Sequence, residues 1–454
     1  MEMGIDMEYN LIIKDFGKIK EANIHVSPLT LFVGDNNSGK SYLLSLIWAL
    51  HSLSTSSPLF DSITELEHPA LQKIKEQLIG LIEKGKSQKI ATSEFSSEYF
   101  IDVFNALCEH SKNAFVSDIF NDSIHIGLLK ISMPNILFTV KIKEQFPEII
   151  SLEFDSGHQE ISFPNSYSHD SSTSLFYIYI ICWLLQSDIT NNTYFLPSAR
   201  TGFVLSKTII NQYSRKRIFD IMPYKERLGD IINSTEPLTK PILHFLDMLE
   251  SASKKRTTNK QKRLVQWIEK ELIHGSVIQT HDPSQEIRYM PIEAKDSLSL
   301  RTSSSVVTEL IPLILLLKNQ PFLKTLCYEE PEMCLHPQLQ YEMGKLLIRI
   351  VNSGVNIIVT THSDIIMQHI NNMCRLNSIK ERKELLERFN LIDEDLIDTS
   401  QVAVYQLKDY GNYSTVEEIK PNKNGFEIPT FYDALMSILE QTTDIQDSVT
   451  EQEA

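Results

Sequence analysis

The chain has 454 residues, which is enough for two or three domains with a sizeable buried core. Hydrophobic residues make up 42% and charged residues 22%, an ordinary balance for a globular protein, and no apolar stretch reaches the roughly 20 residues of a membrane-spanning helix. The formal net charge of −16 disfavours nucleic acid as the main partner, because phosphate binding requires clustered Lys and Arg.

The N-terminus and the cysteines are typical of a cytoplasmic protein. Residues 1–10 (MEMGIDMEYN) are acidic and lack the basic-then-apolar pattern of a secretory signal. The five cysteines form no CxxC pair and no zinc-type spacing with histidine, so we expect buried free thiols in a reducing compartment. We therefore expect a cytoplasmic protein with no membrane partner.

A strand, a glycine-rich loop and a helix are predicted first along the chain. Short strands are expected over residues 8–33, and the last of them runs directly into the segment GDNNSGKS at 34–41. That segment matches the pattern GxxxxGK[ST] in full, and apolar residues then recur at helical spacing over 42–53. A chance match in a loop would lack this strand and this helix, so the order predicts a phosphate-binding loop.

The loop offers two kinds of phosphate ligand and one ligand for Mg²⁺. Its glycines let backbone N–H groups curl around a phosphate at a helix N-terminus, which already favours anions. Lys40 would bring a positive charge to the β- and γ-phosphates of ATP, and Ser41 would place a hydroxyl on Mg²⁺. The predicted nucleotide-binding residues of this loop are Gly34, Asn36, Asn37, Ser38, Gly39, Lys40 and Ser41.

Residues 54–203 have a less distinctive pattern. Helices are expected over 71–82 and 98–108, and strands over 136–142, 149–154 and 193–196. The last strand precedes the segment LPSARTG, which contains Arg200. This side chain would either reach phosphate or a neighbouring loop, or pair with a surface carboxylate.

Residues 204–274 are polar, basic and mostly helical in pattern, and we expect them to form an inserted arm or lid. They contain two basic stretches, 215–217 (RKR) and 253–263 (SKKRTTNKQKR). Each stretch is either a solvated face or a local patch for nucleic acid. The acidic balance of the whole chain favours the solvated face.

Strands and helices alternate after residue 275. A hairpin is expected over 275–292, then helices over 304–318 and 337–351 and strands over 325–328 and 356–360. This alternation is typical of a mostly parallel sheet that helices cover on both faces. After residue 375 we expect a charged helix (379–389), two strands (402–407 and 414–420), a last helix (431–440) and an acidic tail.

Paired acids follow the strand at 325–328. The segment is LCYEEPE, with LHP shortly after it. Hydrolysis that depends on Mg²⁺ needs one carboxylate to orient the shell of the metal and another to polarise the attacking water. We assign the magnesium role to Glu329 and the general-base role to Glu330. Adjacent acids are common on exposed loops, but here an apolar strand precedes them and a proline turn follows.

The strand at 356–360 delivers a histidine at its carboxyl end, in the segment IIVTTHS. Sheets of alternating strands and helices place their ligand sites at the carboxyl ends of the strands. A lone histidine is usually structural, but His362 follows the acidic motif by one helix and one strand. We therefore expect His362 to be catalytic, hydrogen-bonded to a γ-phosphate.

These motifs resemble those of the ABC-type P-loop ATPases, in the AAA group that includes the OLD-like, RecF-like and Rad50-like proteins. The matching segments are NSGKS, YEEPEMCLHP and VTTHS. The resemblance implies an α/β ATPase head, with a mixed or parallel sheet flanked by helices, that hydrolyses ATP to ADP and phosphate with Mg²⁺. It also implies a homodimer or higher homo-oligomer, with ATP sandwiched between the heads.

In this family a serine-rich signature of a second subunit caps the γ-phosphate. The matching stretch here is LSLRTSSSV at 298–306, which leads into the predicted helix 304–318. Ser303 and Ser304 would donate hydrogen bonds at that helix N-terminus. The stretch lacks both glycines of the family signature, and the alternative is an ordinary helix cap. The resemblance also implies that His336 lies near the partner's nucleotide.

The motifs divide the chain into four predicted parts. Residues 1–203 form the first part of the head with the phosphate loop, and residues 204–274 form the helical insertion. Residues 275–375 complete the head with the signature, the paired acids and the histidine. Residues 376–454 form a small C-terminal extension with the acidic tail.

The resemblance implies a role as well as an activity. After residue 363 we expect no Toprim-like constellation, a catalytic Glu and a DxD pair carried on a sheet, and no HNH-like or zinc-nuclease cluster. The layout is similar to ATPase subunits of bacterial anti-phage systems such as PARIS and Septu, whose effector nuclease is a separate protein of the same operon. We expect a sensor and scaffold subunit that holds or activates such a nuclease. The alternative is a RecF-like or Rad50-like DNA-repair ATPase that clamps DNA, which the acidic charge disfavours.

Overall fold

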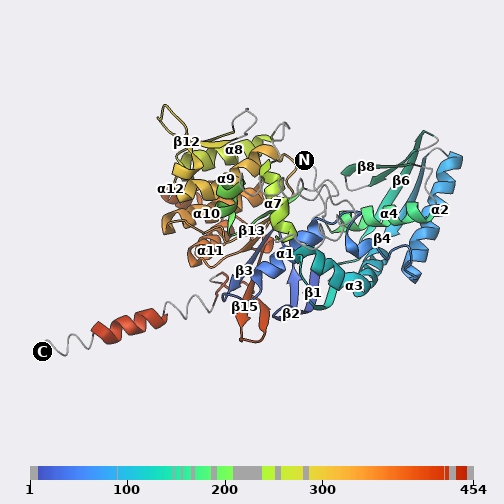
Figure 1. The fold of residues 1–454 in the computed structure, drawn as a ribbon, viewed down its shortest axis with the longest axis horizontal. Helices are drawn as coiled ribbons and strands as arrows, with labels where there is room; N and C mark the ends of the chain where they lie inside the picture. The colour runs from blue at the N-terminus through green and yellow to red at the C-terminus, as the bar shows by residue number, and fades with distance from the viewer. Residues whose placement is uncertain are drawn as a thin grey trace, which may run out of the picture.

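A nine-stranded mixed sheet forms the centre of the computed structural model (Figure 1). Its strand order is β5-β1-β2-β16-β15-β3-β14-β13-β9, and helices flank it, which confirms the predicted α/β class. The strands are β1 (Asn10–Phe16), β2 (Ile19–His25), β3 (Leu29–Gly34), β5 (Ile126–Ser132), β9 (Thr193–Leu196), β13 (Thr325–Glu329), β14 (Asn356–Thr360), β15 (Val402–Asp409) and β16 (Ser414–Glu418). The structure describes residues 9–88, 90–146, 149–154, 157–164, 169–185, 192–207, 238–250, 257–279, 286–423, 425–428 and 436–446.

One half of this sheet is parallel, and it carries the predicted site segments. Strands β15, β3, β14, β13 and β9 lie side by side and run in the same direction. β3 and β13 are buried along their whole length, as is typical of parallel strands with both faces covered. Because parallel strands end at the same edge, the carboxyl ends at Gly34, Glu329 and Thr360 meet there.

Two hydrophobic cores cover the two faces of the sheet. Phe32 of β3 packs in the first core, whereas Leu31 and Val33 pack in the second, because successive side chains of a strand point to opposite faces. The helices of the first core are α1 (Lys40–His51), α2 (Pro69–Gln88), α3 (Ser97–Phe120) and α4 (His169–Leu184). Those of the second include α9 (Ser305–Asn319), α10 (Pro337–Asn352) and α11 (Asp364–Ser378).

A lobe with its own sheet extends from one side of the main sheet (Figure 1). This second sheet is antiparallel, with the order β4-β6-β7-β8. Its strands are β4 (Ile90–Ser96), β6 (Leu137–Phe146), β7 (Ile149–Phe154) and β8 (Gly157–Pro164). The strands expected at 136–142 and 149–154 are therefore present, whereas β4 and β8 were not expected.

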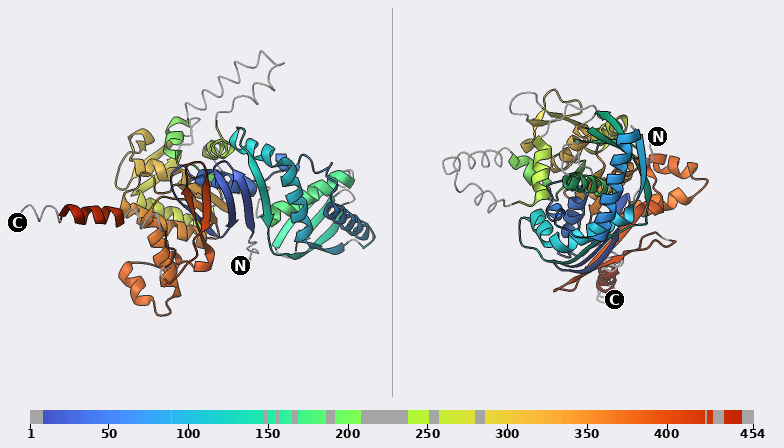
Figure 2. Two further views of the ribbon diagram at one scale, coloured as in Figure 1. Left: turned by 90° about the horizontal axis from the view of Figure 1, so that it is seen from below. Right: turned by 90° about the vertical axis from the view of Figure 1, so that its right-hand side faces the viewer.

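Two strands of the segment 376–454, for which a small C-terminal extension was expected, lie in the main sheet. β15 pairs with β3 from Val402 to Leu407, and β16 joins β15 to β2. The first six residues of β15 are buried, so side chains on both faces of this strand are shielded from solvent. Such burial is typical of a strand in the centre of a sheet that other elements cover on both faces. The helix at 436–446 is exposed and lies apart from the body (Figures 1 and 2).

The described part of the predicted insertion 204–274 packs onto the second core. Helices α7 (Lys240–Glu250) and α8 (Asn259–Trp267) contribute Phe245, Leu249 and Leu264 to that core. The basic stretch 215–217, the start of the stretch 253–263, and the last residues of the acidic tail lie outside the described residues.

Four of the five cysteines are buried free thiols, as expected, but Cys334 is exposed. It lies in the turn between β13 and α10, where its backbone has a left-handed φ of 58°. In the described part of the chain, no helix has the length and apolar character needed to cross a membrane.

Gly34→Ala is expected to lower the free energy of unfolding by roughly 3 kcal/mol. Gly34 has a φ of +118°, and a Cβ there would lie 2.0 Å from the Leu407 carbonyl oxygen on the adjacent strand. Urea unfolding measures the effect. Gly80→Ala in α2 is the control, because a Cβ there meets no atom within 4 Å and alanine favours the helix. A Gly34→Ala variant as stable as the Gly80→Ala variant would contradict the close approach of β15 to β3.

Two buried histidines are expected to make the fold sensitive to acid. His51 and His369 are 1% and 2% exposed, and burial lowers the pKa of each to about 4. The unfolded chain takes up these protons near pH 6.5, so this stability is full above that pH and falls as the pH decreases towards 4.

Between pH 7.5 and pH 5, His369→Phe should therefore lose about 2 kcal/mol less unfolding free energy than the wild type. Urea unfolding of each protein at both pH values measures this difference. Any general effect of the substitution cancels, because each protein is compared with itself. Equal losses in the two proteins would contradict the lowered pKa of His369.

Candidate functional site

The phosphate loop joins β3 to α1 in a tightly turned conformation. Gly34 and Gly39 have φ values of 118° and 99°, and Asn37 has a φ of 60°. Ser38 is fully buried, and its hydroxyl donates to the Asp35 carbonyl oxygen at 2.7 Å. The loop thus leaves the N-terminus of α1 open at the end of β3, where the exposed N–H groups and the helix dipole favour an anion.

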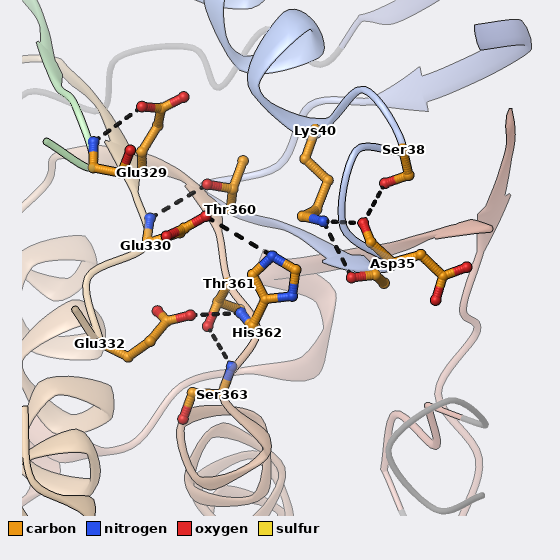
Figure 3. A network of polar contacts seen from close by, with 12 residues as sticks. Asp35, Ser38, Lys40, Glu329, Glu330, Glu332, Thr360, Thr361, His362 and Ser363 are labelled. Carbon is orange, nitrogen blue, oxygen red and sulfur yellow. Dashed lines mark hydrogen bonds and ion pairs between the residues drawn. The ribbon is translucent and has the colours of Figure 1, made fainter. Parts of the chain in front are cut away.

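The Lys40 ammonium lies over this loop (Figure 3). It donates to the carbonyl oxygens of Gly34 at 3.1 Å and Asp35 at 2.5 Å. Burial lowers the pKa of Lys40 to about 8, while the nearby carboxylates of Glu330, Asp35 and Glu332 act in the opposite direction. At neutral pH the Lys40 side chain is therefore mostly charged. To bind a phosphate, it would exchange its hydrogen bonds to the carbonyl oxygens of Gly34 and Asp35 for bonds to phosphate oxygens.

Glu329 and Ser41 face each other where β13 ends. The buried Glu329 carboxylate accepts hydrogen bonds from the Ser198 N–H at 3.0 Å and from the Ser41 hydroxyl. Burial raises the pKa of Glu329, and these two hydrogen bonds lower it. A hydroxyl beside a carboxylate is the kind of oxygen-donor set that Mg²⁺ prefers.

Glu330, the first residue after β13, presents its carboxylate towards the His362 ring (Figure 3). Its Oε1 lies 3.8 Å from Nε2 of His362, and its side chain is 32% exposed. Its backbone is left-handed, with a φ of 42°, and its N–H donates to the Thr360 carbonyl oxygen at 2.9 Å. Of the two adjacent acids, Glu330 is therefore the one that solvent and a ligand can reach.

His362 follows β14 directly, and Glu332 holds its backbone. The His362 N–H donates to Oε1 of Glu332 at 2.5 Å (Figure 3). Burial and the charge on Lys40 lower the pKa of His362, while Glu330 raises it. A neutral imidazole can donate a hydrogen bond from one ring nitrogen and accept one at the other, which suits contact with a phosphate oxygen.

Lys40, Ser41, Glu330 and His362 line one cavity of about 460 Å³. Three separate chain segments meet there: the phosphate loop, the acidic motif and the segment with His362. The lining residues are Gly17, Lys18, Asn36, Asn37, Ser38, Gly39, Lys40, Ser41, Tyr42, Glu330 and His362. Gly34 and Glu329 lie outside the lining and contact it through Lys40 and Ser41.

Ser303 and Ser304 do not line this cavity in their own chain. The Ser304 hydroxyl oxygen accepts a hydrogen bond from the Val307 N–H at 3.4 Å and so caps α9. Ser303 donates to the Ser299 carbonyl oxygen at 3.0 Å. His336 caps α10 in the same way and is exposed.

Arg200 is fully buried, which excludes the surface ion pair considered from the sequence. Its guanidinium pairs with Glu309, a residue of α9 that is itself 1% exposed. It also donates to the backbone carbonyl oxygens of Glu329 and Glu330. The structure therefore agrees with the other alternative, contact with a neighbouring loop.

Asp409, Lys18 and Glu332 support the site, and none of them was identified from the sequence. The Asp409 N–H at the end of β15 donates to the Asp35 carboxylate at 2.9 Å, and Lys18 pairs with Asp409 at 3.1 Å. Asp35 and Asp409 are 374 residues apart, so no local pattern could have joined them. Glu332 did have a signal, because it lies two residues after Glu330 in the same acidic segment.

Comparisons with known proteins come from three sources. A family model described as AAA ATPase domain matches residues 7–367. Among solved structures, the chain is similar to the Smc head domain from Pyrococcus furiosus bound to the C-terminal domain of ScpA, with 12% identity, coverage of 96% of this chain and 99% of that one, and a TM-score of 0.36. It is also similar to the SMC head domain from Thermotoga maritima, with 11% identity, coverage of 91% and 99%, and a TM-score of 0.34. The search of curated proteins gave no match.

Proposed function

This chain belongs to the AAA ATPase domain family, and we propose that it binds ATP with Mg²⁺ in the phosphate-loop cavity and hydrolyses it to ADP and phosphate. One observation carries the proposal: the same cavity is lined by the phosphate loop, the Glu330 carboxylate and the His362 ring. A phosphate anchored by the loop would face both a base and a hydrogen-bond donor. That arrangement suits attack of water on the terminal phosphate.

Each charged group of the cavity has a proposed role. Lys40 would exchange its two backbone carbonyl partners for the β- and γ-phosphate oxygens. Glu330 would accept a proton from the attacking water, because its carboxylate is accessible and the neighbouring acid is buried. His362 would donate a hydrogen bond to the γ-phosphate and stabilise the charge that develops on it.

Ser41 and Glu329 are the residues that would hold Mg²⁺. Their fit rests on the donor set, a hydroxyl and a buried carboxylate in contact with each other. When bound, the ion neutralises phosphate charge and orients the terminal phosphate. Burial raises the pKa of Glu329 because it disfavours the negative charge, and a bound cation would stabilise that charge.

We propose further that ATP is sandwiched between two copies of the chain. Ser303 and Ser304 lie at the N-terminus of the fifteen-residue helix α9 and away from the cavity of their own chain, so they are available to a second one. Their hydroxyls and the helix dipole would then cap the γ-phosphate of the partner. His336 would lie close to the same nucleotide.

At the level of biological role, we propose a sensor and scaffold subunit of a bacterial anti-phage system that holds or activates a separate effector nuclease. The support is the resemblance of the motifs NSGKS, YEEPEMCLHP and VTTHS to those of such ATPase subunits. The net charge of −16 favours a protein partner over direct clamping of DNA.

Two measurements test these proposals in turn. Phosphate release by the purified protein, with Mg²⁺ and with the metal chelated, tests ATP hydrolysis, and its absence in both cases would reject that activity. The mass of the protein co-expressed with its genomic neighbour, with and without Mg²⁺–ATP, tests the scaffold role. A discrete complex containing the neighbour supports that role. A partner-free dimer that binds added DNA would instead favour a repair-type clamp.

A further inference from the structure

We propose that Arg200 is a positioning residue that sets the backbone of Glu330 for hydrolysis, with Glu309 and Thr201 holding its guanidinium in place. This inference rests on the proposed ATPase activity. It concerns a buried ion pair that does not line the cavity. Arg200 and Glu309 are 0% and 1% exposed, so their charges act only on groups inside the protein.

The guanidinium joins three segments of the chain. One terminal nitrogen, Nη1, donates to the carbonyl oxygens of Pro197 at 2.9 Å and Glu329 at 2.7 Å. The other, Nη2, donates to the Glu330 carbonyl oxygen at 3.0 Å and pairs with the Glu309 carboxylate. The two terminal nitrogens thus contact three carbonyl oxygens and one carboxylate.

Burial excludes a direct phosphate contact for Arg200, which is 0% exposed and does not line the cavity. Its Nε is also buried and has no hydrogen-bond partner among the described residues. The guanidinium also stacks over the Tyr328 ring at 4.8 Å, which fixes its plane. Arg200 can therefore influence the reaction only through the groups that it holds.

The backbone of Glu330 has an unfavourable conformation that its surroundings must stabilise. Its left-handed φ of 42° is unfavourable for a residue with a side chain, and such a conformation persists only where the surroundings enforce it. Thr360 binds the Glu330 N–H, and Arg200 binds the Glu330 carbonyl oxygen. Together they fix both peptide groups of this residue, and hence the direction of its carboxylate towards His362 (Figure 3).

Glu309 and Thr201 fix the guanidinium in turn. Burial raises the pKa of Glu309, while the charge of Arg200 and hydrogen bonds from Thr201 and Arg200 lower it. The Thr201 hydroxyl donates to the oxygen of Glu309 that Arg200 does not use. A planar, forked cation is needed here, because an ammonium group on a flexible stem cannot reach three carbonyl oxygens and a carboxylate together.

The test compares Arg200→Lys with Thr201→Val, which removes only the hydroxyl bond to Glu309. Both are measured for kcat, for ATP affinity by calorimetry and for Tm. We expect Arg200→Lys to lower kcat about 30-fold and Thr201→Val about threefold, with ATP affinity nearly unchanged in both. If Arg200→Lys fails to fold, Thr201→Val carries the test, and a wild-type kcat in this folded variant would overturn the proposal.

The Glu330→Gln background separates positioning from general support of the fold. If Arg200 acts through the Glu330 carboxylate, then Thr201→Val or Arg200→Lys should cause no further loss of the residual hydrolysis of Glu330→Gln. A further loss of the same size as in the wild-type background would overturn the proposal. Failure of the wild type itself to hydrolyse ATP would instead count against the proposed activity.

Discussion

Glu330→Gln is expected to lower the rate of ATP hydrolysis by about 100-fold to 10,000-fold while ATP binding stays close to that of the wild type. The amide keeps the size of the side chain and its place beside His362, but it cannot take a proton from the attacking water. Binding persists because the phosphate loop and Lys40 are untouched. The measurements are phosphate release and titration with a fluorescent ATP analogue.

A second consequence follows from the proposed sandwich of ATP between two chains. If hydrolysis separates the two copies, the Glu330→Gln variant should accumulate as a dimer or larger oligomer with Mg²⁺–ATP, as measured by light scattering. Glu384→Gln is the matched control, because this exposed residue of α12 (Lys383–Phe389) does not line the cavity. Hydrolysis by Glu330→Gln at the wild-type rate would remove Glu330 from the role of general base.

The parts of the site that were predictable are those that lie in contiguous segments. A phosphate loop consists of a strand, a glycine-rich loop and a helix within about twenty consecutive residues, so one short segment contains both the motif and its local structure. The acids and His362 each follow an apolar strand, and parallel strands bring their carboxyl ends to one edge. The sequence alone therefore favours the convergence of these segments at one edge of the sheet.

The supports of the site were not predictable in the same way, because they depend on which strands become neighbours. β15 lies beside β3 although it comes from the other end of the chain, and its carbonyl at Leu407 restricts position 34 to glycine. The carbonyl partners of Arg200 could not be predicted from the sequence, because an arginine that follows a strand is equally compatible with a surface position. The antiparallel strands of the lobe were missed in part for a similar reason: they pair with one another in a separate sheet that is weakly marked in the sequence.

Lys40→Ala and Ser304→Asp are each expected to abolish most hydrolysis alone and to recover part of it when mixed. Lys40→Ala removes the charge that binds phosphate, and Ser304→Asp brings a carboxylate to the place where the partner's γ-phosphate is proposed to lie. Aspartate is as good a helix cap as serine, so α9 should keep its N-terminus, and Ser304→Asn provides the neutral control with an equally good cap. We expect losses of about 100-fold for Lys40→Ala and for Ser304→Asp, and little loss for Ser304→Asn.

Mixing decides whether each site is built from two chains. In a dimer of one Lys40→Ala chain and one Ser304→Asp chain, both changes fall in the same composite site, and the other site has an intact Lys40 and an intact Ser304. Random pairing makes about half of the dimers mixed, each with one of two sites restored, so hydrolysis should return to about a quarter of the wild-type rate. If Ser304 served the cavity of its own chain, every site in the mixture would still carry one of the two defects. The rate would then stay at the low level of the separate variants, and the site would have to be completed in another way.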